Sequence, residues 1–188
     1  MNRIAIVLLL AAGVAAAGCG KKAEEKLAEK IIEKSLAKDG MQAKVDISGE
    51  TMSFTTTDAD GKQAKVNVDG DSMTIEGPDG TTTFRAGGAG DMPKDFPADV
   101  YVVSGASVVS SMSYPGGVNL SLTTSAAAKD VAARYSAEMQ AQGWIEQSSM
   151  DTPEVAMLSF VKENRMATVI VQTEDGTTTI NLTVATEQ

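Results

Sequence analysis

The sequence of 188 residues contains no histidine, a single cysteine and few aromatic side chains. Without histidine, the chain lacks the side chain that most often transfers protons near neutral pH and most often ligates transition metals. One cysteine cannot form a disulfide within the chain. Positive charge is also scarce, because 25 acidic residues outnumber 16 basic ones and leave a net charge of −9. An acidic chain repels the phosphate backbone of nucleic acids, so we expect no nucleic-acid partner.

The chain also has no apolar run long enough to cross a bilayer comfortably, which takes about 20 residues. The apolar run IAIVLLLAAGVAAA spans residues 4–17 and follows Met1-Asn2-Arg3. A basic start, a short apolar stretch and small residues at its end are typical of a secretory signal peptide. The pattern therefore predicts export from the cytoplasm.

The segment Ala16-Ala17-Gly18-Cys19 resembles the lipobox of bacterial lipoproteins, with Ala16 where that family prefers leucine. The resemblance implies that the Cys19 thiol receives a diacylglyceryl group. It also implies that the signal peptide, residues 1–18, is cleaved between Gly18 and Cys19. The alternative is a secreted protein that is cleaved near Ala17 and keeps Cys19 as a free thiol. Because a lone thiol is a liability in an oxidising compartment, we expect lipidation.

The same resemblance implies that a membrane is the first partner of the chain. Several acyl chains on one residue hold a protein firmly, since each buried methylene contributes about 0.8 kcal/mol. In Gram-negative bacteria, lipoproteins with Asp directly after the cysteine tend to stay in the inner membrane. Here that position is Gly20. In a Gram-negative host, the resemblance therefore implies an outer-membrane lipoprotein that faces the periplasm.

Residues 19–40 are expected to hold the lipid anchor and an amphipathic helix. The segment KKAEEKLAEKIIEKSLAKDG predicts a helix that ends at Gly40. Its apolar face holds Leu27, Ala28, Ile31, Ile32 and Leu36, between a flank of lysines and a flank of glutamates. Helices that lie on membranes are usually enriched in basic residues, whereas the charges here are nearly balanced. We therefore expect this helix to cover the sheet that follows or to act as a stiff spacer.

Residues 41–86 contain an internal repeat, since KVDISGETMSF (44–54) recurs as KVNVDGDSMTI (65–75). Each copy alternates apolar and polar residues on both sides of a glycine, which predicts a β-hairpin. We expect a small antiparallel meander of two tandem hairpins, with four or five strands. The stretch Asp58-Ala59-Asp60-Gly61 resembles part of a calcium loop, but the flanking segments are strands and Asp-Gly is typical of tight turns. We expect a turn there and no metal site.

A Gly- and Pro-rich stretch, residues 87–98, predicts a linker before a second domain over residues 99–188. That domain begins with the pattern of a hairpin, and a helix is predicted over residues 125–142. Thr124 or Ser125 is expected to cap the start of this helix, and Gly143 its end. Four alternating segments follow, with connections too short for parallel crossovers. The sequence therefore predicts an α+β chain whose C-terminal antiparallel sheet is covered by one helix.

The segments DMPKDFPADVYVVSGASVV and VAARYSAEMQAQGW, followed by paired strands, resemble a recurrent group of bacterial envelope lipoproteins. The likeness covers about residues 91–185 and implies class and fold, but no activity. Its most distinctive residues have structural explanations. Tyr135 and Trp144 are large enough to anchor a helix on a sheet, and Gly143 lets the chain turn out of the helix. We expect these residues to be structural rather than to stack on a ligand.

Three functions remain open. The first is a non-enzymatic, lipid-anchored binding or interaction module with an envelope protein or lipid as partner. The second is a periplasmic carrier or sensor that holds a small apolar ligand between helix 125–142 and its sheet. Several methionines are candidates to line that cavity, although core packing is the simpler explanation for them: Met112, Met139, Met150, Met157 and Met166. The third is a hydrolase that uses carboxylates such as Asp130, Glu138 and Glu163, but these residues form no motif. We expect the first function, with no catalytic residue and no cofactor.

Overall fold

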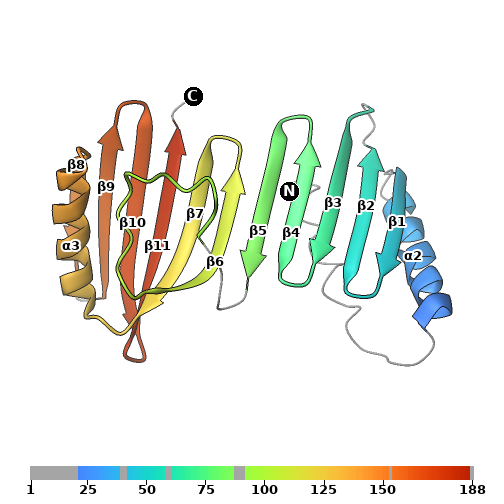
Figure 1. The fold of residues 1–188 in the computed structure, drawn as a ribbon, viewed down its shortest axis with the longest axis horizontal. Helices are drawn as coiled ribbons and strands as arrows, with labels where there is room; N and C mark the ends of the chain where they lie inside the picture. Colours follow the sequence, from blue (N-terminus) through green and yellow to red (C-terminus); the bar gives the residue numbers. More distant parts are fainter. Residues whose placement is uncertain (1–20, 39–41, 58–60, 87–91, 153, 187–188) are drawn as a thin grey trace. The chain divides into compact units, whose positions relative to one another are not determined.

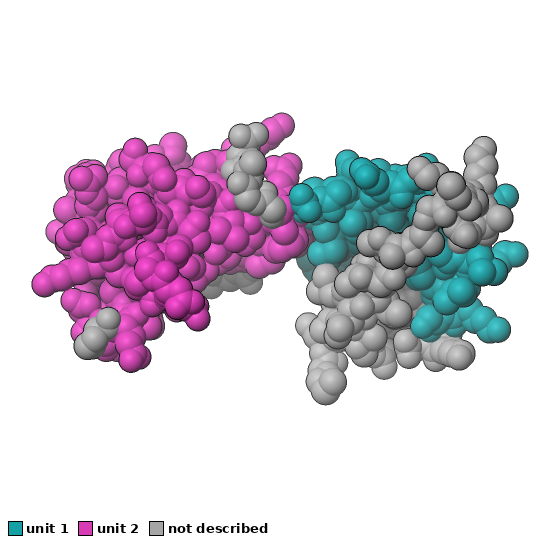
Figure 2. Space-filling model, turned by 90° about the horizontal axis from the view of Figure 1, so that it is seen from below, with its two compact units in different colours: residues 1–79 teal, residues 80–188 magenta. Residues whose placement is uncertain are grey.

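A computed structural model describes the chain except for residues 1–20, 39–41, 58–60, 87–91, 153 and 187–188. The chain divides into two compact units, residues 1–79 and 80–188 (Figure 2). Both combine antiparallel strands with one described helix (Figure 1), so the predicted α+β class is confirmed.

The first unit is the predicted antiparallel meander with a helix beside it. Its elements are α2 (Lys21–Lys38), β1 (Gln42–Ser48), β2 (Thr51–Thr57), β3 (Gln63–Asp69) and β4 (Ser72–Gly77). The two copies of the repeat are the hairpins β1–β2 and β3–β4. Gly49 and Gly70 stand first in the two hairpin turns with φ of 63° and 51°, a backbone region that glycine adopts at little cost.

One row of apolar side chains runs across this meander. Val45 pairs with Phe54, Phe54 with Val66, and Val66 with Ile75. The first three of these side chains form the buried core of the unit, and Ile75 packs against them. The row joins equivalent positions of the two repeat copies, so the repeated sequence places one apolar side chain per strand on the same face.

Helix α2 covers the outer edge of β1 (Figure 1) through three glutamates spaced four residues apart. The Glu33 Oε1 accepts a hydrogen bond from the Val45 N–H at 3.1 Å, and the Glu29 Oε1 accepts one from the Ile47 N–H at 3.0 Å. The Glu25 Oε1 accepts the next, from the Gly49 N–H, at 3.3 Å. The spacings match because four helical residues rise about 6 Å and two strand residues about 6.6 Å.

This glutamate ladder satisfies backbone donors that an edge strand otherwise presents to water or to another chain. The expectation that the helix covers the following sheet is thus met at its edge. We expect Glu29→Ala to speed amide hydrogen exchange at Ile47 about fivefold, since a partly exposed hydrogen bond contributes about 1 kcal/mol. Glu29→Gln keeps an acceptor oxygen and should cause a smaller change. Lys30→Ala, on the exposed side of the same helix, is the control, and equal exchange rates in all three variants would contradict the ladder.

The second unit is a seven-stranded antiparallel sheet with one helix, among the residues described. Its strands lie in the order β5-β6-β7-β11-β10-β9-β8. Their bounds are β5 (Gly80–Ala86), β6 (Ser107–Tyr114), β7 (Gly117–Thr124), β8 (Ile145–Asp151), β9 (Val155–Lys162), β10 (Arg165–Glu174) and β11 (Thr177–Thr186). The predicted β-β-α-β-β-β-β order of the C-terminal part is confirmed. Strand β5, the last strand of the expected meander, pairs with β6 and is grouped with the second unit.

One face of this sheet carries the core. Strands β7, β9, β10 and β11 alternate buried and less buried residues with a period of two. Helix α3 (Ala128–Ala141) packs against β8, β9 and β10 on that face and buries Val131, Tyr135 and Met139. These side chains fill the space beneath the body of the helix together with Leu158, Phe160 and Val169.

The segment before β6 covers the rest of the same face. Figure 1 shows its described part, residues 92–106, crossing β7, β11 and β10 as an irregular segment beside α3, which we call the strap. Val100 and Val103 are buried in the core, and Met92 and Phe96 pack against it. The predicted linker over residues 87–98 therefore needs correction for its described part, because the apolar side chains of residues 92–98 are anchored to the sheet.

The two ends of α3 differ from each other. Neither Thr124 nor Ser125 caps the helix, because Ala127 occupies the N-cap position, without a side-chain hydrogen bond. The end follows the prediction, since Gly143 has a φ of 85°. Its N–H bonds to the Gln140 carbonyl at 2.9 Å, and the Trp144 N–H bonds to the Met139 carbonyl at 3.0 Å. This is a Schellman motif, and it directs Trp144 back toward the core.

Candidate functional site

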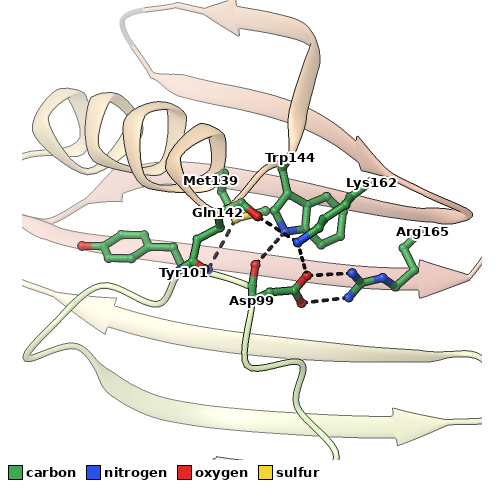
Figure 3. A network of polar contacts seen from close by, with 7 residues as sticks. All are labelled: Asp99, Tyr101, Met139, Gln142, Trp144, Lys162 and Arg165. Atoms are coloured by element: carbon green, nitrogen blue, oxygen red, sulfur yellow. Dashed lines mark hydrogen bonds and ion pairs between the residues drawn. The ribbon is translucent and has the colours of Figure 1, made fainter.

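The most densely connected polar cluster of the second unit surrounds Asp99 (Figure 3). Arg165 donates two hydrogen bonds to the Asp99 carboxylate, from Nη1 at 2.9 Å and from Nη2 at 2.7 Å. Lys162 adds a third from Nζ at 2.7 Å. Asp99 lies on the strap, whereas Lys162 ends β9 and Arg165 begins β10. The cluster therefore ties the strap to the β9–β10 hairpin.

Trp144 connects this cluster to the end of α3. Its indole Nε1 donates to the Asp99 carbonyl at 2.6 Å, and its ring lies 4.9 Å from the Arg165 guanidinium carbon. Lys162 also donates to the Gln142 carbonyl, at the C-cap of α3, at 2.8 Å. Trp144 is 2 % exposed. The helix, the strap and the hairpin thus meet at one side chain, as predicted for a structural tryptophan.

The charges of the cluster compensate one another. The bidentate hydrogen bonds from Arg165 are the main reason that the pKa of Asp99 lies far below its usual range, and Lys162 adds to the effect while partial burial opposes it. The same pairing raises the pKa of Arg165. Since these groups bind each other in a rigid arrangement, the cluster is suited to holding the fold together rather than to transferring protons.

Tyr135 lies deeper in the same unit. It is fully buried beneath α3, and its ring packs edge to face on Tyr101 with centroids 5.2 Å apart. Burial raises the pKa of the Tyr135 hydroxyl well above its ordinary value, so the phenol stays neutral. The prediction that Tyr135 anchors the helix on the sheet agrees with this packing.

A pocket of about 330 Å³ opens at the N-terminal end of α3. It lies between the first turn of the helix, the β8–β9 turn and the sheet. Its apolar part is formed by Ala128, Val155, Ala156 and Val171, and its rim by Lys129, Asp151, Thr152 and Glu154. Val171 and Ala156 belong to the buried core, whereas the four polar side chains of the rim are exposed. The pocket thus joins an apolar floor to a rim of both charges.

Two threonines hold the walls of this pocket. In the β8–β9 turn, the Thr152 hydroxyl donates to the Val155 carbonyl at 2.8 Å and accepts from the Val155 N–H at 3.1 Å. On β11, the buried Thr178 hydroxyl donates to the Ala126 carbonyl at 2.7 Å. These bonds hold the chain just before α3 and the turn opposite it, on two sides of the pocket.

The predicted site beneath helix 125–142 differs from this pocket in position and lining. The body of α3 rests directly on the core, and the pocket lies at its first turn. Of the five candidate methionines, Met139 alone is buried. The remaining four are between 37 % and 50 % exposed: Met112, Met150, Met157 and Met166. Met112, Met157 and Met166 alternate with core residues along their strands, and Met150 lies on β8, whose residues are not buried. These four side chains therefore do not line a cavity beneath the helix.

Other sequence candidates do not converge on a site. Gly18 and Cys19, and the acidic turn at Asp58 and Asp60, lie outside the described residues. Within the described part, no group of three or more acidic side chains is arranged to hold a metal ion. Asp130 and Glu138 are exposed on α3, and Glu163 is exposed in the β9–β10 turn. None of these three carboxylates forms a hydrogen bond with a described residue. The carboxylates proposed for a hydrolase are therefore dispersed.

Periodicity along the chain does not indicate which distant residues the structure brings together. Asp99 lies more than 60 positions before Lys162 and Arg165 along the chain. The pocket residues come from one helix, one turn and three strands. The charge of Arg165 at the start of the apolar segment RMATVIVQ (165–172) is a partial hint.

Comparisons with known proteins add one result. A family model described as START domain-like matches residues 103–180, which is less than half of the chain. The matched range includes α3 and every residue that lines the pocket. No curated protein and no solved structure matches the chain. In the described residues, no helix has the length and apolar character needed to cross a membrane.

Proposed function

We propose that this chain is a lipid-anchored envelope protein whose second unit binds a small amphipathic molecule. The single observation that carries the proposal is the pocket at the first turn of α3, with its apolar floor and charged rim. Ligand sites typically combine an apolar lining with a few polar groups, and about 330 Å³ lies at the lower end of their usual volumes. The START domain-like match supports a ligand-binding role, because it covers all of these residues.

The rim restricts the chemistry of this molecule. Its apolar part would lie against Ala156 and Val171, and its polar part would face Lys129 on one side and Asp151 and Glu154 on the other. Charges of both signs favour a polar group that is itself zwitterionic or rich in hydrogen-bonding atoms. We propose binding without catalysis, since the dispersed carboxylates offer no candidate acid–base pair.

The cellular location of the protein is part of the same proposal. The lipobox-like segment ending at Cys19 supports cleavage after Gly18 and acylation of Cys19. Gly20 after the cysteine supports the outer membrane, facing the periplasm, in a Gram-negative host. An anchored module with a small pocket would retain its ligand at the envelope or sense it there.

Native mass spectrometry of the protein extracted from its own membrane tests both parts. We expect a chain that begins at Cys19 with two or three acyl chains, plus a bound mass that collisional activation removes. Ala128→Leu fills the floor of the pocket and should abolish the bound mass while the acyl chains remain. Ala133→Leu changes an exposed position of the same helix and is the matched control. A bound mass that survives Ala128→Leu would exclude the pocket, and an unacylated chain would exclude the anchor.

A further inference from the structure

The exposed face of α2 differs in charge from the helix as a whole. Leu27 and Ile31 are 63 % and 62 % exposed. Lys26, Lys30 and Lys34 are exposed beside them, and none of the three forms an ion pair with a described residue. Two neighbouring turns of the helix thus present an apolar pair and three cations to the solvent.

The described glutamates of α2 lie on the side of the helix that faces β1. Glu25, Glu29 and Glu33 accept hydrogen bonds from β1 and are only partly exposed. The near balance of charge that the sequence shows is therefore divided between two faces, one anionic and one cationic. A local excess of positive charge is unusual on a chain with a net charge of −9.

We propose that this face of α2 lies on an anionic phospholipid surface. Basic side chains beside an apolar stripe are typical of helices that lie in the plane of a membrane interface. Leu27 and Ile31 would enter the boundary between headgroups and acyl chains, and the three lysines would contact lipid phosphates. Charge complementarity favours this partner, because an anionic bilayer offers phosphates to the lysines and acyl chains to Leu27 and Ile31. The position agrees, since α2 begins at Lys21, two residues after the cysteine that we propose as the anchor.

This placement gives the meander a role. With α2 on the membrane, β1 runs parallel to the surface, because helix and strand lie side by side along the glutamate ladder. Strands β2, β3 and β4 then follow at about 4.8 Å each, so β4 lies about 14 Å farther from the lipid than β1. The first unit would act as a rigid spacer that stands on α2.

Vesicle co-sedimentation tests this inference without depending on the anchor or the pocket. The full chain carrying Cys19→Ser is mixed with vesicles of phosphatidylcholine alone or with about a third phosphatidylglycerol. We expect tighter binding to the anionic vesicles, with the gain lost in about 0.5 M salt as charges are screened. Each lysine near an anionic surface contributes about a fivefold gain in partitioning. Replacing Lys26, Lys30 and Lys34 with Gln should therefore lower the anionic gain at least tenfold.

A matched triple variant tests whether binding depends on the lysines of this face or only on the net charge of the chain. Replacing Lys44, Lys65 and Lys94 with Gln removes the same charge from exposed positions elsewhere, and it should keep most of the gain. Leu27→Ser with Ile31→Ser should weaken binding to both kinds of vesicle. Equal losses in the two triple variants, or no gain from phosphatidylglycerol, would overturn the inference. So would a change of oligomeric state in the Leu27 and Ile31 variant with unchanged vesicle binding, because the face would then contact a second copy. The apolar segment before Cys19 is common to all variants and cancels from the comparison.

Discussion

Replacing Trp144 with alanine is expected to lower the free energy of unfolding of the second unit by about 3–5 kcal/mol, the range for large aromatic side chains in cores. The side chain is almost completely buried, donates a 2.6 Å hydrogen bond to the Asp99 carbonyl and stacks under Arg165. Its removal leaves a cavity where α3, the strap and the β9–β10 hairpin meet. Since small domains are stable by only about 5–15 kcal/mol, much of the stability margin would be lost.

Urea denaturation followed by far-ultraviolet circular dichroism measures this effect. Tryptophan fluorescence is unsuitable, because Trp144 is the only tryptophan in the chain. Trp144→Phe keeps an aromatic ring but loses the N–H donor, so we expect an intermediate loss of about 1–2 kcal/mol. If Trp144→Ala costs less than about 1 kcal/mol, the three elements do not depend on this side chain and the described packing is wrong.

Replacing Asp99 with asparagine is expected to cost about 2–3 kcal/mol at pH 7. The amide cannot accept the paired, charge-assisted bonds of Arg165, and two cations would be left beside each other without their anion. The partly exposed carboxylate, with 29 % of its side-chain surface accessible, keeps the effect below that of a fully buried ion pair. Asp95→Asn is the control, because Asp95 lies on the same strap but accepts one exposed hydrogen bond, from Ser113.

The loss should also depend on pH in a definite direction. The folded-state pKa of Asp99 is depressed, chiefly by Arg165, so the folded protein keeps this carboxylate ionised where the unfolded chain protonates it. Its contribution is therefore fully present above the unfolded pKa of about 4 and declines as the pH falls below that value. The stability difference between the wild type and Asp99→Asn should be constant from about pH 7 to pH 5 and shrink toward pH 3. A difference that stays constant to pH 3 would contradict the ion pair.

These two side chains explain why the strap is part of the domain. A segment rich in glycine and proline has few backbone hydrogen bonds of its own, so side chains must hold it. Here Asp99 supplies both a carboxylate and a backbone carbonyl to residues of other elements. The segments that resemble a group of lipoproteins contain Asp95-Phe96-Pro97 and Gly143-Trp144. They meet in the structure where Trp144 donates to the carbonyl of Asp99, two residues after Pro97.

Local patterns in the sequence determined the secondary structure and much of the pairing. The repeat predicted two hairpins because alternation with a period of two, broken by glycine, has few other solutions. Short connections predicted antiparallel strands, and the spacing of Val131, Tyr135 and Met139 predicted which face of α3 is buried. The end of α3 at Gly143 was predictable because it depends on a local property, the positive φ that glycine adopts at little cost.

Only the tertiary structure decided where distant groups meet. The sequence placed lysines and glutamates on two flanks of α2, but the hydrogen bonds from β1 determined that the glutamates face inward and the lysines face solvent. The Asp99 cluster joins residues more than 60 positions apart, and the pocket joins one helix, one turn and three strands. Periodicity assigns a residue to a face, but it does not say which face of another element lies opposite. That choice depends on packing between elements, and this is why the candidate site was not predicted.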